Sequence, residues 1–315
     1  MFELVFLGTS SSAPSVNRGL SGHIILHRQH RFLLDCGEGT QRQILRSGLG
    51  FKRLNMVLLT HGHLDHILGL GGLVSTLSRW ENLESLDIFG GRSALDRVNN
   101  LLFKVVFPGR NAPVEINLNP LHSGQIILED DKFSLSAFPV RHRGPDCFGF
   151  LFEEKAHRPF LAGKAMELGV PNGPERTQLV RGEAITLEDG RVIEPDEVLG
   201  PAVPGTRYVH IGDVGRTGNL MEICRDADTL VMESTYTEED AEMARKFGHM
   251  TAAKAAQLAK DAGVKTLILT HLSRRYRERD IGNEARSIFP NTYVARDLDH
   301  FQITRDGATR LKKMP

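Results

Sequence analysis

Short apolar runs that end in polar residues predict most of the strands of this chain. The clearest run, at residues 56–59, reads Met-Val-Leu-Leu and leads directly into a histidine-rich loop. Stretches with helical spacing predict helices at residues 40–46, 68–79, 94–103, 251–262 and 284–288. Strands are predicted at residues 3–7, 22–26, 31–34, 56–59, 86–89, 134–140, 148–153, 207–211, 229–232, 266–269, 292–295 and 301–304.

Residues 161–204 break this pattern, because glycine and proline recur along them and apolar clusters are few. Long segments of this kind inside compact chains tend to be functional or disordered. Regular elements resume at residue 207, so we interpret the segment as an insertion that projects from the domain. The sequence therefore predicts a single domain over residues 1–315 with an inserted arm at about 161–204.

The loop after residues 56–59 contains four side chains that can bind metal, namely His61, His63, Asp65 and His66. His61 and His63 are two positions apart, so in an extended backbone both rings leave the same side and can bind one ion. Asp65 and His66 follow where the chain must turn, which suits them to a second ion nearby. A histidine-rich surface loop without any ion is the alternative interpretation.

Three more donors, His142, Asp213 and His271, follow other predicted strands. Together the seven side chains offer nitrogen and oxygen but no thiolate, a mixture that suits Zn²⁺ or Mn²⁺ and disfavours a structural cysteine site. Asp213 arrives alone from its own strand, so it is the candidate bridge between two ions. Ions about 3.5–4 Å apart lower the pKa of a water between them. Taken singly, His142 or His271 would more often be an ordinary polar residue.

Glu233 and His249 form a second group of candidates. A histidine paired with a glutamate near a leaving group could transfer a proton. A turn glutamate and a histidine at a helix end are an equally good explanation of the same residues. Asp35, at the end of a predicted strand, could orient a ligand histidine, or it could only bind amides of its own turn.

Arginines cluster directly after His271, and Tyr276 lies among them. Guanidinium groups beside a two-metal centre suit phosphate, although a solvated start of a charged helix would look the same. The chain has 39 basic and 39 acidic residues, so its formal net charge is zero. Nucleic-acid binding would therefore depend on local patches such as this one. The residues of the patch are Arg274, Arg275, Tyr276, Arg277 and Arg279.

Composition indicates a soluble enzyme-sized protein, with 40% hydrophobic and 25% charged residues. No window approaches the roughly 18 uninterrupted apolar residues of a membrane span, and the N-terminus does not resemble a signal peptide. Three scattered cysteines, Cys36, Cys147 and Cys224, speak against a disulfide framework and for a reducing compartment. We therefore expect a cytoplasmic protein with no membrane association.

Several motifs together resemble one known family. They are residues 6–10 (Phe-Leu-Gly-Thr-Ser), residues 35–41 (Asp-Cys-Gly-Glu-Gly-Thr-Gln), the His61–His66 loop, residues 169–174 with 181–183, Gly212-Asp213, Gly248-His249 and residues 270–276. The chain resembles the metallo-β-lactamase superfamily and, within it, the short-form ribonuclease Z family of transfer-RNA 3′ endonucleases. The likeness runs nearly from end to end.

The resemblance implies an α+β fold, the αββα four-layer sandwich, with a site for two Zn²⁺ per subunit, or for Mn²⁺ or another divalent ion. Asp65 matches the general base of the family, and Glu233 with His249 matches the pair that assists the leaving group. By motif, one ion would be bound by His61, His63, His142 and Asp213, and the other by Asp65, His66, Asp213 and His271.

The arm resembles the exosite that binds the elbow of transfer RNA, typically across a homodimer. The implied reaction is removal of the 3′ trailer from precursor transfer RNA, in which a metal-bridging hydroxide attacks the phosphodiester and leaves a 3′-hydroxyl. Two stretches depart from the family pattern, Val214 after Asp213 and the loop at residues 14–19. The residues expected to contact substrate are Gly173, Pro174, Arg176, Arg181, Arg274 and Tyr276.

Two other functions fit the same fold. A small-molecule metallo-hydrolase, acting on a cyclic phosphodiester, thioester or lactam, would have no use for the arm. A non-catalytic RNA-binding module would be expected to have lost metal ligands, and the sequence retains all seven.

Overall fold

We describe the fold from a computed structural model, which covers residues 1–80, 83–109 and 112–311. These residues form two compact units, which are described separately. The first joins Met1–Glu153 to the chain from Thr206 onward, and the second is Glu154–Gly205. Within the described ranges, no helix combines the length and the apolar character that a bilayer crossing needs.

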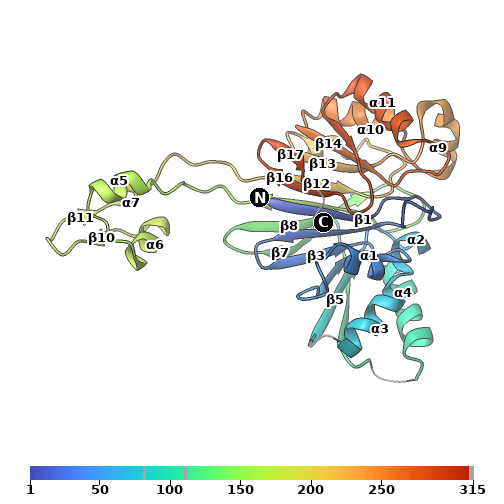
Figure 1. The fold of residues 1–315 in the computed structure, drawn as a ribbon, viewed down its shortest axis with the longest axis horizontal. Coiled ribbons are helices and arrows are strands. Elements are labelled where there is room, and N and C mark those ends of the chain that lie inside the picture. The colour runs from blue at the N-terminus through green and yellow to red at the C-terminus, as the bar shows by residue number, and fades with distance from the viewer. Residues whose placement is uncertain (81–82, 110–111, 312–315) are drawn as a thin grey trace. The chain divides into compact units, whose positions relative to one another are not determined.

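The first unit contains two mixed β-sheets (Figure 1). One sheet has the strand order β17-β16-β1-β2-β3-β4-β5-β6 and the other has the order β15-β14-β13-β12-β9-β8-β7. The first comprises β1 (Phe2–Gly8), β2 (Gly22–His27), β3 (His30–Leu34), β4 (Met56–Leu58), β5 (Ser85–Gly90), β6 (Glu115–Pro120), β16 (His300–Thr304) and β17 (Gly307–Arg310). The second comprises β7 (Ile126–Glu129), β8 (Phe133–Val140), β9 (Cys147–Glu154), β12 (Arg207–Ile211), β13 (Thr229–Glu233), β14 (Thr266–Thr270) and β15 (Thr292–Val294).

Parallel strand pairing in both sheets explains why short apolar runs in the sequence predicted many of the strands correctly. β3 to β6 pair in parallel, as do β12 to β15. Parallel strands are usually covered on both faces and therefore read as continuous apolar runs. All five residues of β13 and of β14 are buried. Their polar successors then emerge at the carboxyl ends of neighbouring strands, at one edge of a sheet.

Three buried clusters divide the first unit into layers. Phe2, Phe6, Phe150 and other large side chains fill the space between the two sheets. A second cluster lies on the outer face of the first sheet, under α1 (Thr40–Arg46), α3 (Leu70–Trp80) and α4 (Arg92–Asn100). A third lies on the outer face of the other sheet, under α10 (Ala252–Asp261) and α11 (Glu278–Ile288). The expected αββα sandwich is confirmed (Figure 1).

The sequence did not predict strands β6, β7 and β17, nor helices α8 (Met221–Cys224) and α9 (Ala241–Phe247). No residue of β6 or β7 is fully buried. β6 alternates apolar and polar residues, and the apolar run of β7 is only three residues long. Helix α11 begins at Glu278, six residues before its predicted start, because its first turn is charged and shows no apolar spacing. The hydrophobic pattern thus missed the strands β6, β7 and β17 at the edges of the two sheets, together with short helices.

The second unit has a small core of its own. It contains α5 (Ala162–Glu167), α6 (Pro174–Val180), α7 (Pro195–Val198) and the short hairpin of β10 (Ile185–Thr186) and β11 (Val192–Ile193). The expectation that this segment has few apolar residues to bury was wrong. Its apolar residues stand singly or in pairs among polar residues, glycines and prolines, so they form no long run in the sequence and meet only after folding. The buried members are Ala165, Val170, Leu179, Ile185, Ile193 and Val198.

Candidate metal centre

The histidine loop is built from the end of β4. The rings of His61 and His63 lie together as expected, with their centroids 4.4 Å apart. His63 is extended and is the N-cap of the short helix α2 (Leu64–Ile67). This turn places Asp65 and His66 in the first turn of the helix, facing a different part of the site. The carbonyl of Thr60 accepts a hydrogen bond from the amide of Phe148 in β9, which ties the loop to the opposite sheet.

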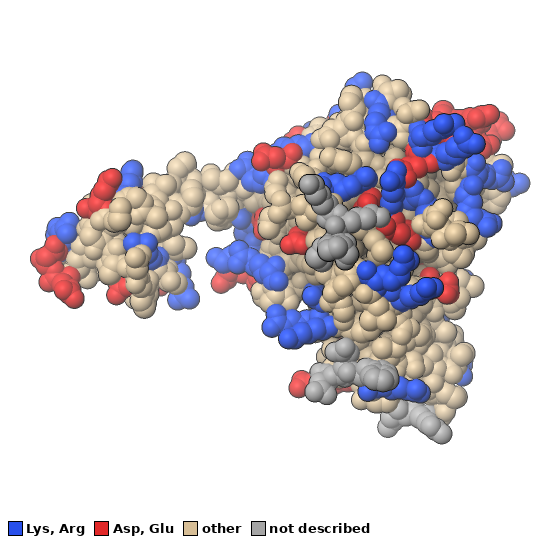
Figure 2. Space-filling view, viewed as in Figure 1, with Lys and Arg blue, Asp and Glu red and all other residues tan. Residues whose placement is uncertain are grey.

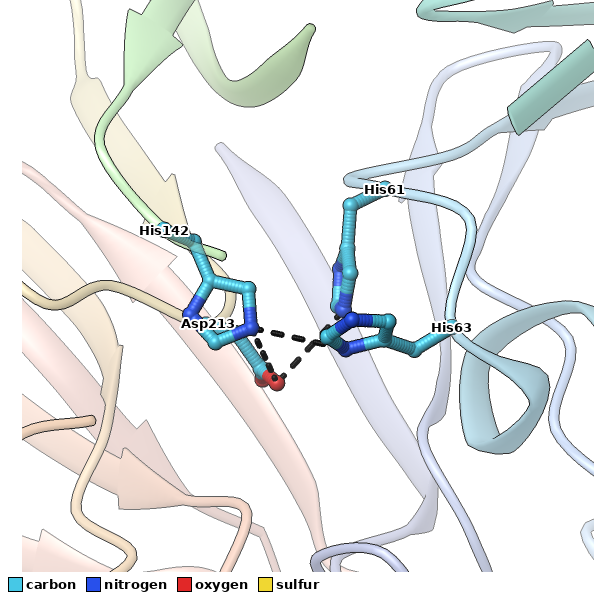
Figure 3. Close-up of side chains that lie close together, drawn as sticks. All are labelled: His61, His63, His142 and Asp213. Carbon is cyan, nitrogen blue, oxygen red and sulfur yellow. Dashed lines mark hydrogen bonds and ion pairs between the residues drawn. The ribbon is translucent and has the colours of Figure 1, made fainter. Parts of the chain in front are cut away.

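One group of side chains gathers around one oxygen of Asp213 (Figure 3). The Oδ2 atom of Asp213 lies 3.6 Å from Nε2 of His61 and 3.6 Å from Nε2 of His142. The Nδ1 atom of His63 lies 3.4 Å from Nε2 of His142. His61 and His63 come from the β4 loop, whereas His142 and Asp213 follow strands of the other sheet, so the group spans the two sheets.

A second group gathers around the other oxygen of the same carboxylate. The Oδ1 atom of Asp213 lies 3.2 Å from Nε2 of His271 and 3.5 Å from Nε2 of His66. The two histidine Nε2 atoms are 3.3 Å apart, and Oδ2 of Asp65 lies 3.4 Å from Nε2 of His271. Asp213 therefore presents one oxygen to each group, the arrangement expected of a bridging carboxylate.

These spacings fit divalent ions bound by four ligands. A tetrahedral ion with bonds of roughly 2.1 Å separates its ligand atoms by about 3.4 Å. The distances within both groups lie close to that value. Among the described residues, Nε2 of His61 and Oδ1 of Asp213 are buried without a hydrogen-bond partner, which is costly unless another ligand satisfies them. The donor set and its spacing therefore suit two metal ions.

The outer nitrogen of three histidines is held by the protein. His66 donates from Nδ1 to Oδ2 of Asp35 at 2.7 Å, and His142 donates from Nδ1 to the carbonyl of Gly248 at 2.7 Å. The Nδ1 atom of His61 lies 3.1 Å from Oγ1 of Thr60. Because each Nδ1 is engaged in this way, each Nε2 can present its lone pair to the centre. The role proposed for Asp35, orienting a ligand histidine, matches this geometry.

Ser12 and Thr235 also support the centre, and the sequence had not singled them out. The amide of Ser12 donates to Oδ2 of Asp65 at 2.8 Å, with Ser12 itself in a left-handed conformation. Thr235 Oγ1 lies 3.0 Å from Nδ1 of His271. Ser12 follows the Gly-Thr-Ser motif near the N-terminus. Its contact uses the backbone amide, which any residue except proline carries, so the residue type could not predict it.

Protonation of the centre is set by burial and by neighbouring charge. Burial disfavours the imidazolium forms of His61, His63 and His142 and lowers their pKa values, so these rings are neutral and can bind metal. Burial also disfavours a charged His66, but the carboxylates of Asp213, Asp35 and Asp65 outweigh it and raise the pKa of His66. Metal binding at the second group would therefore release a proton from His66.

The two carboxylates of the centre are ionised. Burial opposes the charged form of both, yet nearby histidines, chiefly His66 for Asp65 and His271 for Asp213, hold the two pKa values well below the usual range. Ionised carboxylates beside neutral imidazoles are the state in which such a site binds divalent cations.

The buried Glu233 and the half-buried His249 form a pair beside the centre. His249 donates from Nδ1 to Oε1 of Glu233 at 2.9 Å, and the same oxygen accepts from the amide of Val214 at 2.8 Å. Burial disfavours a charged His249, but the carboxylate of Glu233 outweighs this and raises the pKa of His249 to about 9. His249 is thus protonated at neutral pH, with Nδ1 3.8 Å from Oδ2 of Asp213.

The residues expected to contact substrate lie in two places. Arg274 is exposed just after His271, whereas Tyr276 is half-buried and its hydroxyl donates to Asp240. Gly173, Pro174, Arg176 and Arg181 belong to the second unit. Arg176 stacks on Phe160 at 5.5 Å and donates to the carbonyls of Pro171 and Val170, so much of its bonding capacity is used inside that unit.

A separate cleft of about 920 Å³ lies at the opposite edge of the first sheet. It is lined by residues at the starts of β3, β4 and β5, whereas the histidine loop follows the end of β4. None of the predicted site residues lines it.

Comparisons with known proteins agree with this architecture. A family model described as a beta-lactamase superfamily domain matches residues 30–201 and 183–272. Among solved structures, human tRNase Z, short form, superposes with a TM-score of 0.66 at 24% identity, over 96% of this chain and 99% of that one. The metallo-beta-lactamase fold protein YhfI from Bacillus subtilis superposes with a TM-score of 0.68 at 18% identity, over 95% of this chain and 98% of that one. These similarities establish the fold.

Relatives with similar sequences identify the family within this superfamily. Ribonuclease Z of Bradyrhizobium diazoefficiens is 46% identical over 303 residues, which cover 96% of this chain and 100% of the relative. Ribonuclease Z of Archaeoglobus fulgidus is 37% identical, over 97% of this chain and 99% of the relative. The expected resemblance is confirmed on both fold and sequence, and the chain belongs to the ribonuclease Z family of the metallo-β-lactamase superfamily.

Proposed function

We propose that this protein is a metal-dependent endoribonuclease that removes the 3′ trailer from precursor transfer RNA and leaves a 3′-hydroxyl. The observation that carries the proposal is the paired geometry around Asp213, whose two oxygens each face one group of histidines. Full-length similarity to proteins named ribonuclease Z supports the choice of substrate.

Two Zn²⁺ ions, or other divalent ions, are the proposed cofactors. The first would be held by His61, His63, His142 and Asp213, and the second by Asp65, His66, His271 and Asp213. Bound there, the ions would supply an activated water and neutralise charge on the phosphate.

Side chains at the centre can carry out both proton transfers of the reaction, one from the attacking water and one to the leaving group. Water attacks phosphorus, and the bond from phosphorus to the 3′-oxygen of the last transfer-RNA nucleotide breaks. Asp65, which is ionised, is proposed as the general base that takes the proton of the attacking water. His249 is protonated and held by Glu233, so it can donate its proton to the departing 3′-oxygen.

The second unit, with Gly173, Pro174, Arg176 and Arg181, is proposed as a substrate-binding exosite that is inserted into a single metallo-β-lactamase-fold domain. Arg274 and Tyr276 are proposed to contact phosphate. We further propose a cytoplasmic homodimer.

Figure 2 shows basic and acidic side chains interspersed over the drawn face, so RNA affinity would come from local clusters of arginine.

The test is cleavage of a 3′-extended transfer-RNA precursor by metal-replete protein, with chelator and Asp213→Ala as controls. We expect a transfer RNA with a 3′-hydroxyl and a trailer with a 5′-phosphate, and no product in either control. A metal-replete protein that leaves the precursor intact but hydrolyses a cyclic phosphodiester, thioester or lactam would overturn the proposal in favour of a small-molecule hydrolase.

A further inference from the structure

Phe247 is an exposed aromatic ring beside two cations. It is the last residue of α9, and 37% of its surface is exposed. The guanidinium carbon of Arg143 lies 5.8 Å from the ring centroid, and Nζ of Lys246 lies 5.7 Å from it. Basic and acidic side chains both gather at the α9 end of the molecule in Figure 2.

The ring does not serve the core. Of the side chains that the structure describes, those packed against the four buried clusters do not include Phe247. An aromatic ring left partly in water, with the side chains of Lys246 on its own helix and of Arg143 beside it, is better explained by a ligand than by packing.

The backbone ties this ring to the metal centre. The next residue, Gly248, has a left-handed φ of 71°, and its carbonyl accepts the hydrogen bond from His142. A Cβ atom at Gly248 would lie 2.8 Å from Cγ of Arg143, so the stem of Arg143 lies directly over this glycine. His249 follows, and its ring centroid is 5.0 Å from that of His142. Phe247 and Arg143 therefore border the site on the side of His142 and His249.

We propose that Phe247, with Arg143 and Lys246, forms a subsite that stacks a nucleobase of the RNA substrate. This rests on the proposed endoribonuclease function. His249 is the proposed proton donor to the departing 3′-oxygen, and Phe247 lies two residues before it. The base stacked on Phe247 is therefore that of the nucleotide on the 5′ side of the scissile phosphate, which carries this oxygen. Arg143 and Lys246 would contact the flanking phosphates.

The size of the effect follows from stacking. A base on an aromatic ring contributes about 1–3 kcal/mol to binding, so Phe247→Ala should lower kcat/KM on precursor transfer RNA by roughly 5- to 150-fold. Phe247→Trp should keep most of the activity, because it keeps a flat ring. Ile126→Ala, which removes an apolar side chain exposed to 55% on β7, is the matched control and should change little.

The deciding experiment pairs these variants with a precursor that lacks the base on the 5′ side of the cut. Wild type should lose about as much rate on this abasic precursor as Phe247→Ala loses on the intact one, and Phe247→Ala should lose nothing further on it. Metal content and circular dichroism of each variant verify that the centre and the fold are intact.

Two failures would be distinguishable. If wild type cleaves no precursor, the proposed function fails. If wild type cleaves but Phe247→Ala loses the same factor on intact and abasic precursors, or loses none, the stacking subsite alone is overturned.

Discussion

Asp213 joins two halves of the centre that the sequence places far apart. One carboxylate oxygen faces His61 and His142, and the other faces His66 and His271. Removal of this side chain should therefore affect both of the proposed ions, whereas removal of His63, a proposed ligand of one ion, should affect only that ion. The metal content of two variants can separate these cases.

We expect Asp213→Ala to lose about two bound ions per chain and His63→Ala about one, with hydrolysis abolished in both. His63 is half-buried at the edge of the site, so its loss should cost the sandwich little stability. Elemental analysis of purified protein, with thermal unfolding as the check on folding, measures the difference. Asp213→Ala with a wild-type metal content would refute the bridging assignment.

A buried histidine away from the metal ligands should make the fold sensitive to acid. His210 is 1% exposed between the sheets, and its Nδ1 accepts from the hydroxyl of Tyr208 at 2.7 Å. Burial lowers its pKa to about 3, against an ordinary 6.5. Between these pH values the unfolded chain binds a proton that the folded chain excludes, so unfolding is favoured as pH falls below 6.5.

From pH 7 to pH 5 this group should cost about 2 kcal/mol of stability. His210→Phe should lose less stability over this interval than wild type does, by about that amount. Tyr208→Phe removes the hydrogen bond but keeps the imidazole, so it should keep the acid sensitivity. Denaturant unfolding at the two pH values gives the comparison, and equal losses in wild type and His210→Phe would contradict the assignment.

At the scale of elements, the ends of β3 and β4 are joined by one carboxylate. Asp35 follows β3 and accepts from the amide and the hydroxyl of Thr60, both at 2.8 Å, as well as from His66. It thereby fixes the start of the histidine loop and the orientation of one ligand.

Asp35→Ala should lower metal affinity by roughly 10- to 100-fold, as is typical when a partner of a ligand histidine is removed. Competition with a chelating dye would measure this change. Asp96→Ala, which removes an exposed carboxylate from α4, is the control and should bind metal as wild type does. Equal affinity in the two variants would show that the loop orients itself without Asp35.

The sequence predicted the buried strands more accurately than the half-exposed ones. Strands such as β12 and β14 are almost entirely buried and were located to within a residue, so the metal donors that follow them could be predicted from the sequence. The half-exposed β6 alternates apolar and polar residues and β7 has an apolar run of only three residues, and both strands were missed. The contacts of Ser12 and Thr235 depend on which strand ends meet, so residue type alone could not reveal them.

At the scale of the whole molecule, the second unit can be tested by removing it. Because this unit has a small core of its own, a partial deletion, such as residues 169–183, would remove α6 together with Val170 and Leu179. It would then expose the rest of that core, for example Ala165 and Ile185. A cleaner cut uses the paired backbone at Phe160 and Leu199, which form an antiparallel bridge and can be joined by a short turn.

Deletion of residues 161–198 with such a turn should leave metal content near that of wild type. Hydrolysis of a small activated phosphodiester should persist, because the proposed metal ligands all belong to the first unit. Cleavage of precursor transfer RNA should fall steeply through KM, because remote contacts that position a large substrate are lost. Steady-state kinetics on both substrates measures the separation, and unchanged cleavage of the precursor would remove the exosite role.

The insertion has a consequence for how such enzymes can diversify. β9 and β12 are adjacent antiparallel strands, with Arg207 opposite Glu153, so the second unit occupies the place of a hairpin loop. A gene can lengthen, shorten or exchange a hairpin loop without altering the register of either strand. Evolution could therefore change which substrate the second unit binds without changing the residues of the metal centre. The junction between β9 and β12 is for the same reason a suitable place to engineer binding of new substrates.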